Sequence, residues 1–275
     1  SEESADEILN GIACWGDSLT YGYNGDGTSY PAVLQSSISA NISKAIKVVN
    51  LGACGEDSIT IAGRNGGIPY TAAEDTVIKK NTSEDLILKI RSKSGKAVSP
   101  SLYNDIGINP CHIDGVEGTL SIAETGNPDS DYIFRRKSPG SEVNVTDGDQ
   151  IVTAASEEYR NYYPLIFIGT NGGYDDYDDL IEQQNSMITE DQRKSGHFLI
   201  IGITCGSDEE MSDYDNVMEK EYGENYFNLR SYMVNNGLQA AGISADSHDE
   251  KNIAAGIVPH SLRSDDVHFN KTRYE

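Results

Sequence analysis

The chain changes its hydrophobic pattern twice, and these changes constrain the fold more than any other feature. Both ends alternate short apolar runs with helical patterns, whereas the middle alternates apolar and polar residues with a period of two. Strands are expected at residues 12–15, 45–49, 165–168, 198–204 and 226–229, and helices after Ser29 and at residues 179–188 and 208–222. Strands that alternate with helices predict a parallel sheet covered on both faces.

The middle of the chain, residues 72–158, reads as an all-β insertion. Leu86, Leu88 and Ile90 share one side of a predicted strand, and turn signals such as Ser138-Pro139-Gly140 separate the runs. We expect a small sandwich or barrel. Residues 1–71 and 159–275 are then two parts of one α/β domain, and the points where the insertion joins it should lie near one rim of that domain.

Composition restricts the partners. The 275 residues carry a formal net charge of −23, which repels nucleic acid and anionic membranes. No apolar run is long enough to span a bilayer. The four cysteines are scattered without metal-ligand spacing, and residues 1–7 lack the features of a signal peptide, so the sequence leaves the compartment and the oligomeric state open.

One serine stands where open α/β sheets place their active sites. Ser18 lies in Gly16-Asp17-Ser18-Leu19-Thr20, directly after the first predicted strand. Near the other end of the chain, Asp265 precedes His268 by three residues, so one short segment can supply both an imidazole base and the carboxylate that orients it. Ser18, His268 and Asp265 therefore form a candidate triad, with Asp266 as the alternative acid.

Two further segments could stabilise a developing oxyanion. Residues 50–58 and 169–173 are rich in glycine, and each follows a predicted strand. Backbone N–H groups at glycine and the carboxamide of Asn171 are suitable donors to the negative oxygen of a tetrahedral intermediate.

These four segments, in this order, resemble the SGNH hydrolases, also called the GDSL esterase/lipase family. The resemblance implies a flavodoxin-like three-layer α/β/α domain with a parallel sheet. It also implies oxyanion donors from the Ser18 amide, the Asn171 side chain and the Gly55 amide, with Gly52 the less favoured glycine. Two positions depart from the family pattern, because Gly172 replaces a common aspartate and Phe269 a common proline.

The sequence thus predicts a serine esterase that needs neither a cofactor nor a metal. Short-chain acyl esters on carbohydrate, O-acetyl groups above all, suit a hydrophilic acidic chain. A lysophospholipase, a thioesterase and a non-catalytic glycan-binding protein are the alternatives. The β insertion could bind carbohydrate, act as a lid or have no ligand. The family commonly ends in a further helix, so we expect the natural C-terminus to extend beyond residue 275.

Several other residues remain candidates for binding. Asp17, beside the nucleophile, and Arg64, Asn65 and Tyr70, before the insertion, are possible substrate contacts. The acidic run at residues 174–179 lacks a calcium-loop pattern, and acidic residues are expected at the start of a helix. The other four histidines are expected to be structural, and they are His112, His197, His248 and His260.

Overall fold

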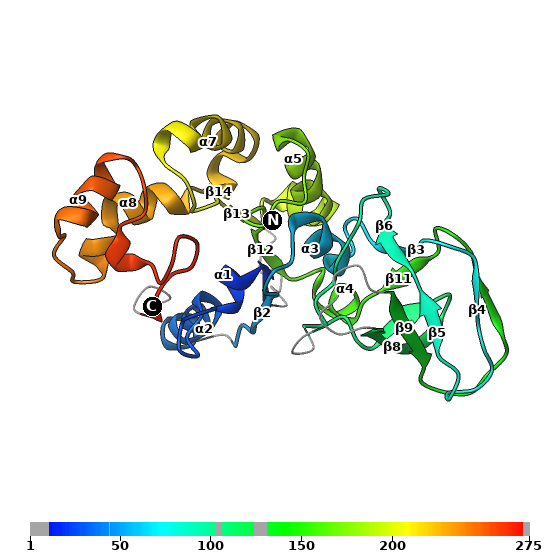
Figure 1. Ribbon diagram of the computed structural model, residues 1–275. Helices are drawn as coiled ribbons and strands as arrows, with labels where there is room; N and C mark the ends of the chain where they lie inside the picture. Colours follow the sequence, from blue (N-terminus) through cyan, green and yellow to red (C-terminus); the bar gives the residue numbers. More distant parts are fainter. Residues whose placement is uncertain (1–10, 44, 103–105, 124–130, 272–275) are drawn as a thin grey trace, which may run out of the picture.

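The computed structural model describes residues 11–43, 45–102, 106–123 and 131–271. The N-terminal segment considered above, residues 1–7, lies outside the described residues. Within them the chain forms a five-stranded parallel sheet with helices and a seven-stranded antiparallel sheet (Figure 1). The expected α/β class and the β-rich middle are therefore both present. No helix in these described ranges is long and apolar enough to cross a membrane.

The parallel sheet contains the first strands and the last strands of the chain. Its members are β1 (Ile12–Gly16), β2 (Val48–Gly52), β12 (Tyr163–Phe167), β13 (Leu199–Ile201) and β14 (Tyr226–Phe227). They are ordered β14-β13-β12-β1-β2, and every neighbouring pair is parallel. β2 lies on one side of β1, and the next strand of this sheet, β12, lies on the other side. The strand order therefore reverses between β1 and β12, and the carboxyl ends of these two strands flank that point.

Helices cover both faces of this sheet. They are α1 (Ser18–Tyr21), α2 (Tyr30–Asn41), α3 (Ser58–Asn65), α4 (Ala154–Tyr159), α5 (Tyr177–Ser186), α6 (Glu190–Ser195), α7 (Asp208–Tyr222), α8 (Leu229–Ala240) and α9 (Ser247–Ala254), with 3₁₀ turns η1 (Gly223–Asn225) and η2 (His260–Leu262). Trp15 of β1 packs in a cluster with residues of α3, α5 and α7, whereas Cys14 packs in a second cluster with residues of α2 and α8. Adjacent residues of β1 thus pack into the cores on opposite faces of the sheet, because successive side chains of a strand point to opposite faces.

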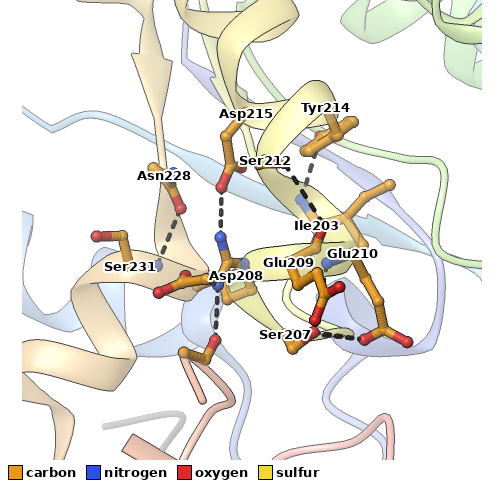
Figure 2. Close-up of polar contacts among 12 residues, drawn as sticks. Ile203, Ser207, Asp208, Glu209, Glu210, Ser212, Tyr214, Asp215, Asn228 and Ser231 are labelled. Carbon is orange, nitrogen blue, oxygen red and sulfur yellow. Dashed lines mark hydrogen bonds and ion pairs between the residues drawn. The ribbon is translucent and has the colours of Figure 1, made fainter. Parts of the chain in front are cut away.

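Helix α7 begins and ends as the sequence predicts, because its start signal is local. Ser207 and Glu210 form a capping box that satisfies the first N–H groups of the helix (Figure 2). Arg230 of α8 is buried and pairs with Asp208 and Asp215 of α7, and the Tyr214 hydroxyl accepts a hydrogen bond from the N–H of Ile203. These contacts fasten α7 to the end of β13 and to α8.

The middle of the chain builds its own hydrophobic core. Its strands are β3 (Tyr70–Ala72), β4 (Thr76–Ile78), β5 (Leu86–Leu88), β6 (Ile90–Ser92), β7 (Cys111–Ile113), β8 (Val116–Ile122), β9 (Tyr132–Arg136), β10 (Val143–Val145) and β11 (Gln150–Val152). Seven form the antiparallel sheet β5-β9-β8-β7-β11-β3-β6, and β4 pairs with β10. Ile78 and Val145 of this ribbon share one core with the sheet, so the module has two layers.

Two details differ from the expectations. The strand expected at residues 86–91 is two strands, because β5 pairs with β9 whereas β6 pairs with β3 at the opposite edge of the sheet. The antiparallel sheet spans Tyr70 to Val152 rather than residues 72–158, and α4 packs on α3 and places Ala155 in the core of the parallel sheet. In Figure 1, α3 and α4 lie beside the antiparallel strands.

Candidate active site

Ser18 is held in the sharp turn between β1 and α1. The preceding residue, Asp17, caps the short helix by accepting a hydrogen bond of 2.8 Å from the N–H of Leu19. Ser18 is the first residue of α1, so its own N–H has no acceptor within the helix. The side chain stands at the carboxyl end of β1, and 7 % of the residue is exposed.

His268 and Asp265 meet this serine. The Nε2 atom of His268 lies 2.8 Å from the Ser18 hydroxyl, and its Nδ1 atom lies 2.9 Å from Oδ2 of Asp265. In a neutral imidazole, Nδ1–H donating to the carboxylate leaves Nε2 as the acceptor for the serine proton. The three side chains therefore form a hydrogen-bonded series of the kind by which an imidazole can activate a serine.

The acid of this series is Asp265 and not Asp266. Burial raises the pKa of Asp265, but N–H donors from His268 and Val267 and the nearby imidazole outweigh it, so the pKa is lowered below its ordinary value. Asp266 points into solvent and lies 3.6 Å from Arg263. A carboxylate that stays ionised beside the imidazole is the one able to stabilise the imidazolium.

The loop that carries His268 is fastened to the domain. Arg263 and Phe269 pair as an antiparallel bridge, and the N–H of Ser264 donates to the carbonyl of His268 at 2.8 Å. Phe269 is buried and belongs to the same hydrophobic cluster as Leu19 of α1. Phe269 thus anchors the loop to the hydrophobic core.

The loop after β2 supplies the second candidate oxyanion donor. Gly52 is packed too tightly to serve, because a Cβ there would lie 2.1 Å from the backbone nitrogen of Tyr21 and its N–H already donates to Asn50. Gly55 is exposed, and nothing lies within 4 Å of where its Cβ would stand. Of the two glycines, Gly55 is the one whose amide a ligand can approach.

Asn171 lies against the same loop. Its Nδ2 atom donates to the carbonyl of Glu56 at 2.9 Å, which uses one of its two N–H groups and leaves the other for a ligand. The carbonyl of Gly172 accepts from both the N–H and the hydroxyl of Ser58, so the Asn171 turn is tied to the start of α3. Gly172 has a φ of 74°, a left-handed conformation that favours glycine.

Three of the residues expected to contact substrate are buried and cannot do so. Arg64, Asn65 and Tyr70 are fully buried, and each makes side-chain hydrogen bonds inside the protein. The Tyr70 hydroxyl donates to the carbonyl of Thr60, and Asn65 accepts a hydrogen bond from Arg160. These side chains offer no surface to a ligand, and we assign them structural roles.

Arg64 forms a buried ion pair with Glu56, and both side chains are 0 % exposed. Its guanidinium donates to Oε2 of Glu56 and to the carbonyl of Leu51, each at 2.9 Å. The other oxygen, Oε1 of Glu56, accepts the N–H of Ser101 from the insertion at 3.0 Å. This pair fixes the loop that contains Gly55 and joins it to the insertion.

Asp17 is also too buried to contact substrate freely, with 1 % of its surface exposed. Burial raises the pKa of its carboxyl to about 6, against a smaller lowering by the Leu19 N–H and by His268. Its Oδ2 atom makes no hydrogen bond within the described part of the chain. We assign Asp17 to the support of the Ser18 turn.

Sequence reasoning missed Glu56 and Tyr23. Glu56 sits in a polar loop and carries no periodic signal. The hint in the sequence is that its partner Arg64 lies on a helix that also carries Ile59 and Ile61. The Tyr23 ring lies 4.7 Å from the imidazole of His268, centroid to centroid. Nothing in the turn-like sequence around Tyr23 marks such a contact.

The remaining candidates lie away from this series. His112 is 3.3 Å from Glu157, and His248 stacks on His260. Within the acidic run, Asp176 caps α5. Lys96 of the insertion forms ion pairs with Asp175 and Asp179 of the same run. Among the described residues, no group of three or more His, Cys, Asp or Glu could hold a metal ion.

Comparison of the chain with protein-family models, with curated proteins and with solved structures gave no match.

Proposed function

We propose that this protein is a serine hydrolase of SGNH type that cleaves short-chain acyl esters. The observation that carries the proposal is the hydrogen-bonded series Ser18–His268–Asp265, with distances of 2.8 and 2.9 Å. The sheet order supports it, since in chain order the five strands lie 2-1-3-4-5, which is the order of flavodoxin-type doubly wound folds. Ser18 also lies at the strand end where such folds hold their ligands.

In the proposed reaction, the Ser18 oxygen attacks the ester carbonyl carbon while His268 takes the hydroxyl proton. The carbonyl oxygen becomes an oxyanion that the amides of Ser18 and Gly55 and the carboxamide of Asn171 can stabilise. The tetrahedral intermediate expels the alcohol, whose oxygen receives the proton from His268, and an acyl-serine remains. Water, deprotonated by His268, then attacks this ester and releases the acid.

Carbohydrate O-acetyl esters are the proposed substrates. The net charge of −23 disfavours polyanionic substrates and suits neutral ones. Lysophospholipid and thioester substrates share the same chemistry and are alternatives that substrate panels separate. A non-catalytic glycan-binding protein would have no need of a serine hydroxyl held by an imidazole, so the series favours turnover.

The test compares wild type with Ser18→Ala on p-nitrophenyl acetate and with a fluorophosphonate probe. In the probe reaction the Ser18 oxygen bonds to phosphorus and fluoride leaves, which gives a mass increase on the peptide containing Ser18. Ser37→Ala, a change at an exposed serine of α2, is the matched control. Equal acetate hydrolysis by wild type and Ser18→Ala, with no labelling of Ser18, would refute the hydrolase.

A further inference from the structure

A cavity of about 340 Å³ opens beside the candidate triad. It is lined by Tyr21, Tyr23, Gly52, Ala53, Cys54, Ser101 and Ile106. Two contacts place it next to the reacting groups. The N–H of Ala53 donates to the carbonyl of Gly16 at the Ser18 turn, and the Tyr23 ring packs against His268.

The lining indicates an uncharged ligand. None of the described residues that line it carries a charge, although 44 of the 275 residues of the chain are acidic. Tyr21 and Tyr23 are 40 % and 46 % exposed, and a tyrosine presents an apolar ring together with a polar hydroxyl. The volume falls at the small end of the range for ligand sites, so the cavity suits one ring-sized group.

The insertion forms one wall of this cavity, and that wall is held in place. Ser101 and Ile106 come from the insertion, and their backbone groups bond to the buried ion pair. The N–H of Ser101 donates to Glu56 at 3.0 Å, and Arg64 reaches the carbonyl of Ile106 at 3.5 Å. Ser101 and Ile106 are therefore tied to the same ion pair that fixes the loop containing Gly55.

We propose that this cavity binds the alcohol part of the ester, as a single uncharged ring such as one pyranose residue. The inference rests on the proposed function. His268 must deliver its proton to the leaving oxygen, so the group attached to that oxygen lies beside the imidazole. Tyr23 touches the imidazole and also lines the cavity. An acetyl group, in contrast, is too small to need a site of this volume.

The first test fills the cavity from the insertion side. Ile106→Trp is compared with Ile87→Trp, which makes the same change at an exposed position of β5. Three substrates are used: methyl acetate, a mono-acetylated methyl glucopyranoside, and methyl hexanoate. Ile106→Trp should lower kcat/KM for the acetylated glucoside, relative to methyl acetate, by about tenfold or more. Ile87→Trp should leave that ratio unchanged.

Two results of this experiment would overturn the proposal. An unchanged ratio in Ile106→Trp would show that the alcohol does not occupy the cavity. A selective loss on methyl hexanoate would assign the cavity to the acyl chain instead.

The second test does not depend on turnover. Cys54 is exposed in the cavity, whereas Cys14 and Cys111 are buried. In Ser18→Ala protein, benzyl methanethiosulfonate forms a disulfide with Cys54 and releases methanesulfinate. Methyl glucopyranoside should slow this labelling several-fold. In the control variant Cys54→Ser, any labelling that remains measures the reaction of Cys205. Protection by hexanoate but not by the glucoside would overturn the proposal.

The two proposals can fail separately. If wild type and Ser18→Ala hydrolyse methyl acetate equally, the hydrolase is refuted, yet protection of Cys54 by the glucoside would still show a sugar in the cavity. If wild type is active, but Ile106→Trp leaves the kinetic ratio unchanged and the glucoside does not slow the labelling of Cys54, only the assignment of the cavity fails.

Discussion

The hydroxyl of Ser18 lies 2.8 Å from Nε2 of His268, although 250 positions of sequence separate the two residues. The contact exists because Ser18 starts α1 after β1, while Phe269, which follows His268, is buried in the same hydrophobic cluster as Leu19 of that helix. In Figure 1 the C-terminal segment, drawn in red, returns to the region of the blue helix α1.

The first prediction separates Asp265 from Asp266. Asp265→Ala should lower kcat for p-nitrophenyl acetate by 10²-fold to about 10⁴-fold, because the imidazole loses the carboxylate that sets its tautomer. Asp266→Ala should remain within about twofold of wild type, since that side chain points into solvent and exposed ion pairs contribute little. A larger loss from Asp266→Ala would contradict the assignment.

The second prediction concerns Asn171. Asn171→Ala should lower kcat by roughly 10²–10³-fold with little change in KM, because an oxyanion donor acts mainly on the transition state. Thermal unfolding of the variant checks that the loop tied to Ser58 still folds. If KM rises while kcat is preserved, Asn171 binds the ground-state substrate and is not an oxyanion donor.

The third prediction concerns the ion pair of Arg64 and Glu56, which solvent does not reach. Arg64→Met leaves a buried carboxylate unpaired and should lower the free energy of unfolding by about 3–5 kcal/mol, measured by urea denaturation. The double variant Arg64→Met/Glu56→Gln should recover part of this loss, because no unpaired charge remains. If the free energy of unfolding of the double variant falls by the full sum of the decreases in the two single variants, the two residues are not coupled.

The fourth prediction is a pH dependence at Asp17. Burial raises the pKa of this carboxyl from 3.8 to about 6, so the folded state holds the proton more tightly than the unfolded state between these two pH values. Stability therefore falls as pH rises through this window, by up to about 3 kcal/mol from this group.

Asp17→Asn removes the titration and keeps a side chain able to cap α1. The stability of Asp17→Asn relative to wild type should rise between pH 4 and pH 6 and level off above it, as measured by urea denaturation at a series of pH values. A relative stability that is flat across this range would show that Asp17 titrates normally in the folded protein.

Local signals in the sequence were sufficient for much of the fold. Helix α7 spans Asp208–Tyr222 as expected, because its capping box lies within four consecutive residues. Burial along β9 alternates because side chains of a strand alternate between its faces. The residues of the candidate triad could also be proposed from the sequence, since a serine after a strand and an acid three residues before a histidine are patterns of short range.

Only the tertiary structure decided which of these local pieces meet. Periodicity could not show that residues 86–91 divide between β5 and β6, because strand pairing depends on distant partners. Nor could it show that Arg64 is buried, since a charged residue enters a core only when a partner such as Glu56 is brought to it. The amino-acid sequence determined the elements and the chemical groups they carry, whereas long-range packing determined their neighbours, and the proposed chemistry depends on those neighbours.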